Sequence, residues 1–323
     1  MNQRKTVFVT GASGFVGAAL VDRLASAGDC QVLALVRREG VTLPANAVPV
    51  RVSADYLATE SLLALEGVDV LVHCAARVHV MSDASSDPLT EYRMVNVDGT
   101  LKLAQRAAHA GVERFIFISS IKVNGEATQP GAPYTADDVP APCDPYGVSK
   151  KEAEEQLKIL AKKTGMDVVI IRPVLVYGPG VKANFRSMMN WLNKGIVLPL
   201  GAIRNQRSLV SLDNLIDLIV VCLDHPAAAN QIFLASDGDD MSTTDLLTRM
   251  GIALGKPARL IPVPAALLQL GAALIGRKAI GQRLCGSLQV DIAKTRRLLE
   301  WTPPSTVTAA LRKTAESFQG SLK

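Results

Sequence analysis

Short β-rich apolar runs alternate with stretches of helical periodicity through the first half of the chain. The β-rich runs cover residues 6–10, 30–38, 69–76, 114–120 and 167–178. Apolar residues at helical spacing follow the first run and recur around 57–65, 91–111 and 145–164. Strands that alternate with helices in this way predict an α/β fold with a parallel, doubly wound sheet.

Three glycines, Gly11, Gly14 and Gly17, interrupt the first apolar run within the segment GASGFVG. Because a strand precedes them and a helix follows, free backbone N–H groups and the positive helix end would face an anion such as a pyrophosphate. Gly11 would make the turn, Gly14 would admit the phosphates, and Gly17 would let helix and strand pack closely. We therefore predict a Rossmann-type dinucleotide site here; the alternative is an ordinary strand-to-helix turn.

Beyond residue 173 the strand and helix rhythm gives way to glycine- and proline-rich connections and a helix-rich tail. We predict a dinucleotide-binding Rossmann domain of residues 1–172 and about 208–232. Residues 173–207 and 233–323 would form a smaller C-terminal substrate-binding lobe. It would lie at the sheet edge where ligands of doubly wound folds bind.

Composition excludes several classes of protein. The 323 residues are 48% hydrophobic and 20% charged, as expected of a folded globular protein. The net charge of +5 comes from dispersed basic residues and aromatics make up only 4%, so no nucleic-acid partner is expected. Five cysteines without paired spacing argue against disulfides and a metal site, and favour the reducing cytoplasm.

The uncharged run 260–276 is short for a membrane-spanning helix and contains two prolines. We expect a buried core helix there and no stable membrane insertion, with interfacial membrane association as the alternative. No cleavable leader is expected either, because the first strand begins at residue 6.

The segment PCDPYGVSKKEAEEQLKILAKKTG carries the strongest chemical signal. Asp144 suits a helix N-cap and Gly165 suits the helix end, which places Tyr146 and Lys150 four apart on one face near the N-terminus. A free tyrosine has a pKa near 10. A neighbouring ammonium and the positive helix end are expected to lower this pKa toward neutrality. If this segment stood alone, we would interpret the pair as a chance spacing of two residues on a solvent-exposed helix.

Two serines end the strand at 114–120, at the predicted carboxyl edge of the sheet. A hydroxyl of Ser119 or Ser120 could hold a substrate carbonyl while the tyrosine exchanges a proton with it. A simple strand-to-loop exit is the alternative. The glycine turn and the Tyr146 and Lys150 pair make the chemical interpretation the favoured one.

The motifs GASGFVG, HCAA, VNVDGT, SSIKVNG, YGVSK and RPVLVYGPG occur in this order along the chain. In them the chain resembles the extended short-chain dehydrogenase/reductase family, in its nucleotide-sugar epimerase, dehydratase and reductase branch. The resemblance implies that Tyr146 is the acid/base, that Lys150 binds the nicotinamide ribose and lowers the tyrosine pKa, and that Ser120 orients the reacting oxygen. It implies a structural role for Asn96, while Asn124 replaces the tyrosine of most relatives and leaves a substrate contact there in doubt.

The same resemblance implies a cofactor site and a substrate site. Expected cofactor-binding residues are Gly11, Ser13, Gly14, Phe15, Val16, Gly17, Arg37, Asp55, Ala75, Ala76, Tyr146, Lys150, Pro173 and Val176. Expected substrate-binding residues are Ser120, Asn184 and Arg207, the last two toward the diphosphate or uridine of a UDP-sugar. A homodimer is common in the family and is expected here.

Arg37 bears on the choice of cofactor and reaction. It follows Val36 where NAD-preferring relatives usually carry a carboxylate, so we expect NADP to be favoured and NAD to be possible. The favoured reaction is therefore reduction at C4 of a UDP-4-keto-6-deoxy-N-acetylhexosamine in surface-polysaccharide (lipopolysaccharide) synthesis. Alternatives are a UDP-glucose or UDP-N-acetylglucosamine 4-epimerase and a non-catalytic NAD(P)-sensing protein. Dehydration is disfavoured because no Asp-Glu pair follows Ser120.

Overall fold

A computed structural model describes residues 4–37, 40–52, 65–78, 87–129, 131–274, 276 and 278–322, with 278–280 as backbone only. Within these ranges a seven-stranded sheet has the order β3-β2-β1-β4-β5-β6-β9, and every neighbouring pair is parallel. Its strands are β1 (Thr6–Thr10), β2 (Gln31–Val36), β3 (Ala47–Arg51), β4 (Val70–His73), β5 (Arg114–Ile118), β6 (Asp167–Pro173) and β9 (Ile232–Ala235). This confirms the predicted α/β fold with a doubly wound parallel sheet.

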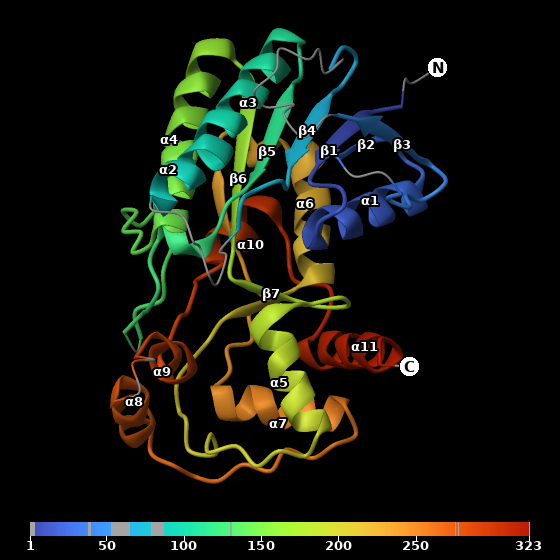
Figure 1. Ribbon diagram of the computed structural model, residues 1–323. Coiled ribbons are helices and arrows are strands. Elements are labelled where there is room, and N and C mark those ends of the chain that lie inside the picture. The colour runs from blue at the N-terminus through green and yellow to red at the C-terminus, as the bar shows by residue number, and fades with distance from the viewer. Residues whose placement is uncertain are drawn as a thin grey trace.

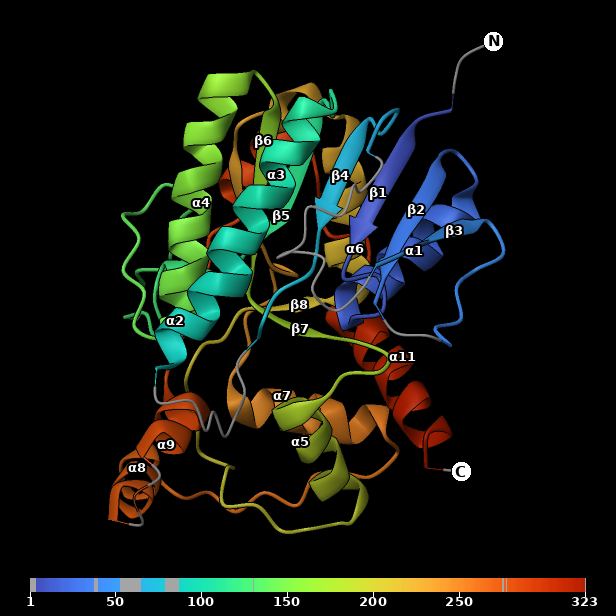
Figure 2. The same ribbon diagram turned by 45° about the horizontal axis from the view of Figure 1, so that its top comes forward.

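Helices cover both faces of the sheet (Figures 1 and 2). Helices α1 (Phe15–Ala27), α6 (Leu212–Asp224) and α10 (Ala293–Leu299) lie on one face; α2 (Pro88–Arg93), α3 (Thr100–His109) and α4 (Pro145–Thr164) lie on the other. Strand residues alternate between two buried clusters: Val7 and Val9 pack toward α1 and α6, whereas Phe8 packs toward α3 and α4. Burial on both faces explains why these strands are continuous apolar runs in the sequence.

A smaller set of elements lies beyond the carboxyl ends of the strands (Figure 1). Strands β7 (Leu175–Tyr177) and β8 (Leu209–Ser211) form a separate parallel ribbon. Helices α5 (Ala183–Asn193), α7 (Thr243–Ala253) and α11 (Val307–Gly320) share a second core that includes Phe185, Leu247 and Phe318. The helices α8 (Ala265–Leu274) and α9 (Lys278–Cys285) form a hairpin at its side.

The division into two lobes stays a proposal, with one change of boundary. Because β9 continues the large sheet to Ala235, the chain would pass to the smaller lobe after this strand and not at residue 233. The predicted strand 167–178 divides at Val174 into β6 and β7. The predicted helix 91–111 is α2, a π-helix (Met94–Gly99) and α3 in succession. The predicted helix around 57–65 falls almost wholly outside the described residues.

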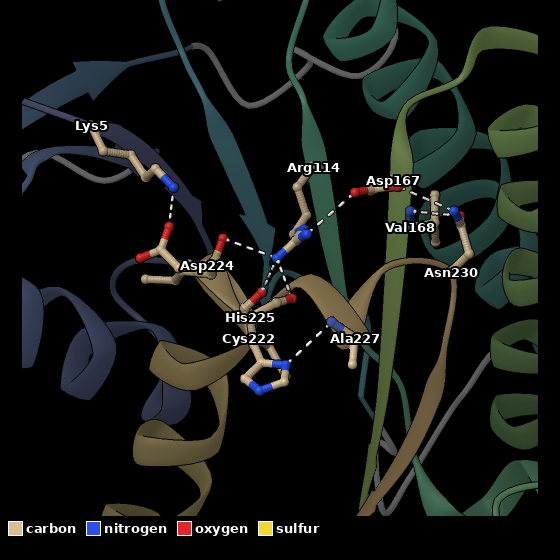
Figure 3. A network of polar contacts seen from close by, with 10 residues as sticks. Lys5, Arg114, Asp167, Val168, Cys222, Asp224, His225, Ala227 and Asn230 are labelled. Atoms are coloured by element: carbon tan, nitrogen blue, oxygen red, sulfur yellow. Dashed lines mark hydrogen bonds and ion pairs between the residues drawn. The ribbon is translucent and has the colours of Figure 1, made fainter. Parts of the chain in front are cut away.

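Arg114 organises the amino-terminal edge of the sheet (Figure 3). Its Nη1 donates to the carbonyl oxygens of Cys222 at 2.9 Å, Leu223 at 3.2 Å and His225 at 3.1 Å, and its Nη2 donates to Asp167 at 3.2 Å. The guanidinium thereby satisfies carbonyls that α6 leaves open at its C-terminus. This network lies at the end of the sheet opposite the carboxyl edge, and we assign it to stability.

Among the described residues, no helix combines the length and the apolarity that crossing a membrane requires.

Candidate functional site

The glycine turn is packed too closely for any side chain. Gly11 has a φ of 67°, in the left-handed region that favours glycine. A Cβ there would lie 2.7 Å from the backbone nitrogen of Ala75, and a Cβ on Gly17 would lie 2.2 Å from the carbonyl oxygen of Gly11. Gly14 donates its N–H to that same oxygen at 2.8 Å. Gly11 therefore lies in close backbone contact with the segment after β4 on one side and with α1 on the other.

The start of α1 faces open space. Ser13 and Gly14 are exposed, Phe15 and Val16 are half-buried, and the N-cap Gly14 has no side-chain capping bond. A pocket of about 310 Å³ lies along the side of α1, between residues that include Ser13, Ala18 and Asp22 and the segment 41–44. Exposed backbone N–H groups at a helix N-terminus without a side-chain cap suit a pyrophosphate, so these residues fit a bound dinucleotide.

The other expected cofactor residues gather at the carboxyl edge of the same sheet. Arg37 follows β2 with an exposed side chain, Ala75 and Ala76 follow β4 and are half-buried, and Pro173 ends β6. Val176 lies half-buried in β7. Asp55, the expected adenine contact, lies outside the described residues. Their binding roles stay predictions.

The helix that carries Tyr146 and Lys150 has the predicted bounds, because its end signals operate as expected. The Asp144 side chain caps its start by accepting from the Gly147 N–H at 2.7 Å, and Gly165 ends it in the left-handed conformation. Ser120 is the second residue after β5, and its Oγ accepts from the Lys122 N–H at 3.3 Å. The Ser120 hydroxyl lies close enough to the Tyr146 phenol to lower its pKa. The structure thus brings the predicted serine and tyrosine together.

The expected lowering of the Tyr146 pKa is wrong for this structure. Burial raises that pKa, the Asp144 carboxylate raises it further, and the nearby Ser120 hydroxyl only partly opposes them. Lys150 instead donates to the carbonyl oxygen of Ile118 at 2.8 Å and lies 4.2 Å from the ring centroid of Phe117. Burial lowers the pKa of Lys150 to about 7, against the opposing charge of Glu154.

Beneath these residues lies a fully buried ion pair that the motifs did not reveal. The side chains of Glu154 and Arg172 are 2% and 1% exposed, and Arg172 Nε donates to Glu154 Oε1 at 2.9 Å. Ser119 donates to the same carboxylate at 2.6 Å, and Arg172 Nη1 donates to Asn124 Oδ1 at 2.9 Å. The Asn124 side chain therefore points into the interior, where its oxygen accepts from Arg172. In the sequence, the one feature that could have indicated this ion pair was Glu154, which lies one helical turn after Lys150.

Asn96 has the structural role that the resemblance implied. Its Oδ1 accepts from the Arg77 N–H at 2.8 Å, and its Nδ2 donates to the Arg77 carbonyl and to Ser149 Oγ, both at 3.0 Å. Since it is only 1% exposed, these bonds satisfy an otherwise costly buried amide. It ties the segment after β4 to α4, beside Lys150.

The two expected substrate residues lie in the smaller lobe. Asn184 is exposed in the first turn of α5. Arg207 is half-buried and its Nη1 donates to the carbonyl oxygens of Arg283 and Gly286, both at 3.1 Å. Burial, followed by the charge of Arg283, lowers the pKa of Arg207. Their contact with substrate stays a prediction.

Comparison with known proteins bears on the chemistry of this site. The chain is 50% identical over 315 residues to a UDP-glucose 4-epimerase of Vibrio cholerae, covering 97% of this chain and 95% of the relative. The fold matches a UDP-glucose 4-epimerase of Thermotoga maritima solved with UDP-glucose (TM-score 0.79, 22% identity, 98% and 100% of the two chains). It also matches a UDP-glucuronic acid 4-epimerase of Bacillus cereus solved with NAD (TM-score 0.78, 21% identity, 97% and 96%).

The family profile covers the sheet domain from its first strand to its last. Residues 7–235, from β1 through β9, match the profile of the NAD dependent epimerase/dehydratase family. The match spans the glycine turn, Ser120, Tyr146 and Lys150. The chain belongs to the NAD dependent epimerase/dehydratase family.

Proposed function

We propose that this chain is a UDP-sugar 4-epimerase that inverts C4 of UDP-glucose or UDP-N-acetylglucosamine. The observation that carries the proposal is the 50% identity, over 97% of the chain, to the Vibrio cholerae UDP-glucose 4-epimerase. The relatives thereby favour epimerisation over the 4-reduction that the sequence motifs led us to expect. The serine, tyrosine and lysine at the carboxyl edge supply the groups that either reaction needs.

Each of the three residues has a definite task in the proposed reaction. Tyr146 takes the proton of the C4 hydroxyl and later returns it, while the neighbouring Ser120 hydroxyl holds the same substrate oxygen. Lys150, whose pKa of about 7 lets it carry a charge near neutrality, stabilises the phenolate. Bound NAD supplies the hydride acceptor and donor. Inversion requires only that the oxidised sugar rotate in the site, so that the hydride is returned to the opposite face of C4.

We assign NAD to the glycine turn. The family description names NAD, and the Bacillus cereus epimerase of similar fold was solved with it. An epimerase regenerates its cofactor in every cycle, so it has no need of the reducing NADPH pool. The NADP preference expected from Arg37 has no support among these relatives. A homodimer, a cytoplasmic location and a role in surface-polysaccharide synthesis stay predictions from the family resemblance.

Reduction of a 4-keto sugar nucleotide is the second candidate, and Arg37 is the observation that favours it. Its side chain is exposed at the end of β2, where a guanidinium could meet a 2′-phosphate. The two reactions differ in what they consume. A reductase uses one equivalent of NADPH for each sugar, whereas an epimerase uses none.

The test is to incubate purified protein separately with UDP-glucose and with UDP-N-acetylglucosamine, and to follow the products by chromatography. The proposal predicts UDP-galactose or UDP-N-acetylgalactosamine without any reductant. Oxidation of NADPH that depends on a UDP-4-keto-6-deoxy sugar, with no interconversion, would establish the reductase. Cofactor binding with neither reaction would establish the sensing protein.

A further inference from the structure

Helix α8 is apolar and yet uncovered. Its sequence is AALLQLGAAL, none of its residues is buried, and Gln269 is its sole polar side chain. In both views the α8 and α9 hairpin stands at the outer side of the smaller lobe, away from the sheet (Figures 1 and 2). A helix that is apolar nearly all round normally has a partner on more than one side.

One side of α8 already has a partner within the chain. Ala265 and Leu268 pack against the core of the smaller lobe, and a Cβ on Gly281 of α9 would lie 2.9 Å from the Cβ of Ala272. The outer side carries Leu267, Leu270 and Leu274, which are 59%, 58% and 79% exposed. Their spacing of three and four residues aligns them in one stripe along the helix. We call these three leucines the α8 stripe.

The charged residues in the sequence of this hairpin and its flanks are all basic. Between Asp245 and Asp291 the sequence holds no acidic residue, and Arg277, Lys278 and Arg283 fall directly after the α8 stripe. The Arg283 side chain is exposed at the end of α9. An apolar stripe with basic neighbours matches a surface that is apolar inside and anionic outside, as a bilayer with acidic lipids is.

We propose that the α8 stripe docks this protein on the surface of an anionic lipid bilayer, with the helix lying in the plane of the interface. A ten-residue helix is about 15 Å long, so one stripe of it falls short of the roughly 800 Å² per partner typical of a stable protein dimer. A symmetric contact between two copies would also oppose like charges. Docking requires no membrane crossing, which accords with the absence of a spanning helix among the described residues.

The docking surface is connected to the proposed substrate site. The Arg207 guanidinium donates to the carbonyl oxygens of Arg283 and Gly286, at the end of the same hairpin. A membrane contact through α8 would therefore set the substrate lobe next to the bilayer. The inference itself does not depend on the 4-epimerase reaction.

The test is sedimentation of the full chain with vesicles of equal parts phosphatidylglycerol and phosphatidylcholine, and with vesicles of phosphatidylcholine alone. We expect binding to the anionic vesicles that weakens as salt is raised. Leu270→Glu should reduce this binding about tenfold or more, since an exposed leucine that would insert into the bilayer interface is replaced by a charge. Arg283→Gln should reduce it roughly fivefold. Leu322→Glu is the matched control, because Leu322 is 52% exposed near the other end of the lobe, and its binding should equal that of the parent.

Circular dichroism of each variant checks that it is folded. Failure of the parent to bind anionic vesicles would overturn the proposal, and so would equal losses in Leu270→Glu and Leu322→Glu. Sedimentation velocity tests whether a second copy of the chain, and not a bilayer, covers the α8 stripe. If the parent self-associates, binds no vesicles and becomes monomeric on Leu270→Glu, a second copy covers the α8 stripe.

Discussion

Tyr146 and Lys150 lie one helical turn apart, and burial moves their pKa values in opposite directions. The phenol is held in its neutral form, and the ammonium is brought to a pKa of about 7. Both shifts have the same cause, since a buried site disfavours whichever form is charged. In the proposed reaction, phenolate formation would therefore depend on the Ser120 hydroxyl and on a protonated Lys150.

We expect Tyr146→Phe to lower kcat by a hundred to ten thousandfold, roughly the contribution of a positioned acid/base. Cofactor affinity should stay close to that of the parent because the ring remains. Tyr92→Phe is the control, since Tyr92 packs edge-on against Tyr146 at 6.0 Å and its hydroxyl makes only a 3.5 Å contact with the Val78 carbonyl. Turnover of Tyr146→Phe within a few fold of the parent would show that another group moves the proton.

His73 gives the protein a predictable sensitivity to acid. It lies buried between Thr10 Oγ1 at 2.7 Å and Thr100 Oγ1 at 3.0 Å, and burial lowers its pKa from 6.5 to about 3. Between these two values the unfolded chain binds the proton and the folded chain does not. The free energy of unfolding should therefore fall as pH falls from 6.5 toward 3, with His73 contributing up to about 1.4 kcal/mol per pH unit.

Urea unfolding at several pH values measures this contribution. His73→Gln should flatten the dependence on pH in that window, whereas His109→Gln, on the exposed face of α3, should leave it unchanged. The account of His73 fails if the parent and His73→Gln lose stability with the same slope.

At the scale of elements, the sequence predicts best where local signals mark both ends. Strand β1 and helix α4 have the predicted bounds, the latter because Asp144, Pro145 and Gly165 punctuate it. Strand β3 was not predicted, since AVPVR is largely exposed at the sheet edge and contains a proline. The π-helix within 91–111 was missed because its apolar pattern is that of one continuous helix.

The candidate site was predictable in its residues but not in its electrostatics. Motif order identifies Ser120, Tyr146 and Lys150, because each lies at a position fixed by its own strand or helix end. The direction of the Tyr146 pKa depends on how deeply the fold buries the phenol, and no local pattern carries that depth. The pairing of Glu154 with Arg172 likewise exists only once α4 has packed on β6.

Gly17 is the position where α1 is most sensitive to a single methyl group. Gly17→Ala would place its Cβ against the Gly11 backbone, so the turn must move and we expect a loss of about 1–3 kcal/mol in stability together with weaker NAD binding. Gly271→Ala is the matched control within a helix, since a Cβ there meets nothing within 4 Å and gains helix propensity. Equal urea midpoints for Gly17→Ala and the parent would contradict the packing described for the turn.

Arg114→Ala tests the opposite edge of the sheet. Removing the guanidinium leaves the α6 carbonyls without their donor, and we expect a loss of about 1.5–3 kcal/mol in the free energy of unfolding. kcat should not change, because the network lies at the amino-terminal edge (Figure 3). Arg312→Ala, which removes an exposed 3.9 Å pair with Glu316, should stay within about 0.5 kcal/mol of the parent. A marked fall in kcat for folded Arg114→Ala would contradict this separation of roles.

At the scale of the whole molecule, the fold separates stability from chemistry along the strand direction. The Arg114 network holds the amino-terminal edge, while the glycine turn, Ser120, Tyr146 and Lys150 occupy the carboxyl edge that faces the smaller lobe (Figure 1). Under the proposed function, the smaller lobe would hold the sugar while the carboxyl edge of the sheet would hold the cofactor.

The central claim is that C4 of a UDP-sugar gives up its hydrogen and receives the same hydrogen on the opposite face. The most direct measurement uses UDP-glucose labelled with deuterium at C4, incubated with the purified protein in ordinary water and analysed by mass spectrometry. The account predicts UDP-galactose that retains the deuterium at C4. The Tyr146→Phe variant should no longer form this product. UDP-galactose that has lost the label to water, or no 4-epimer from either UDP-glucose or UDP-N-acetylglucosamine, would contradict it.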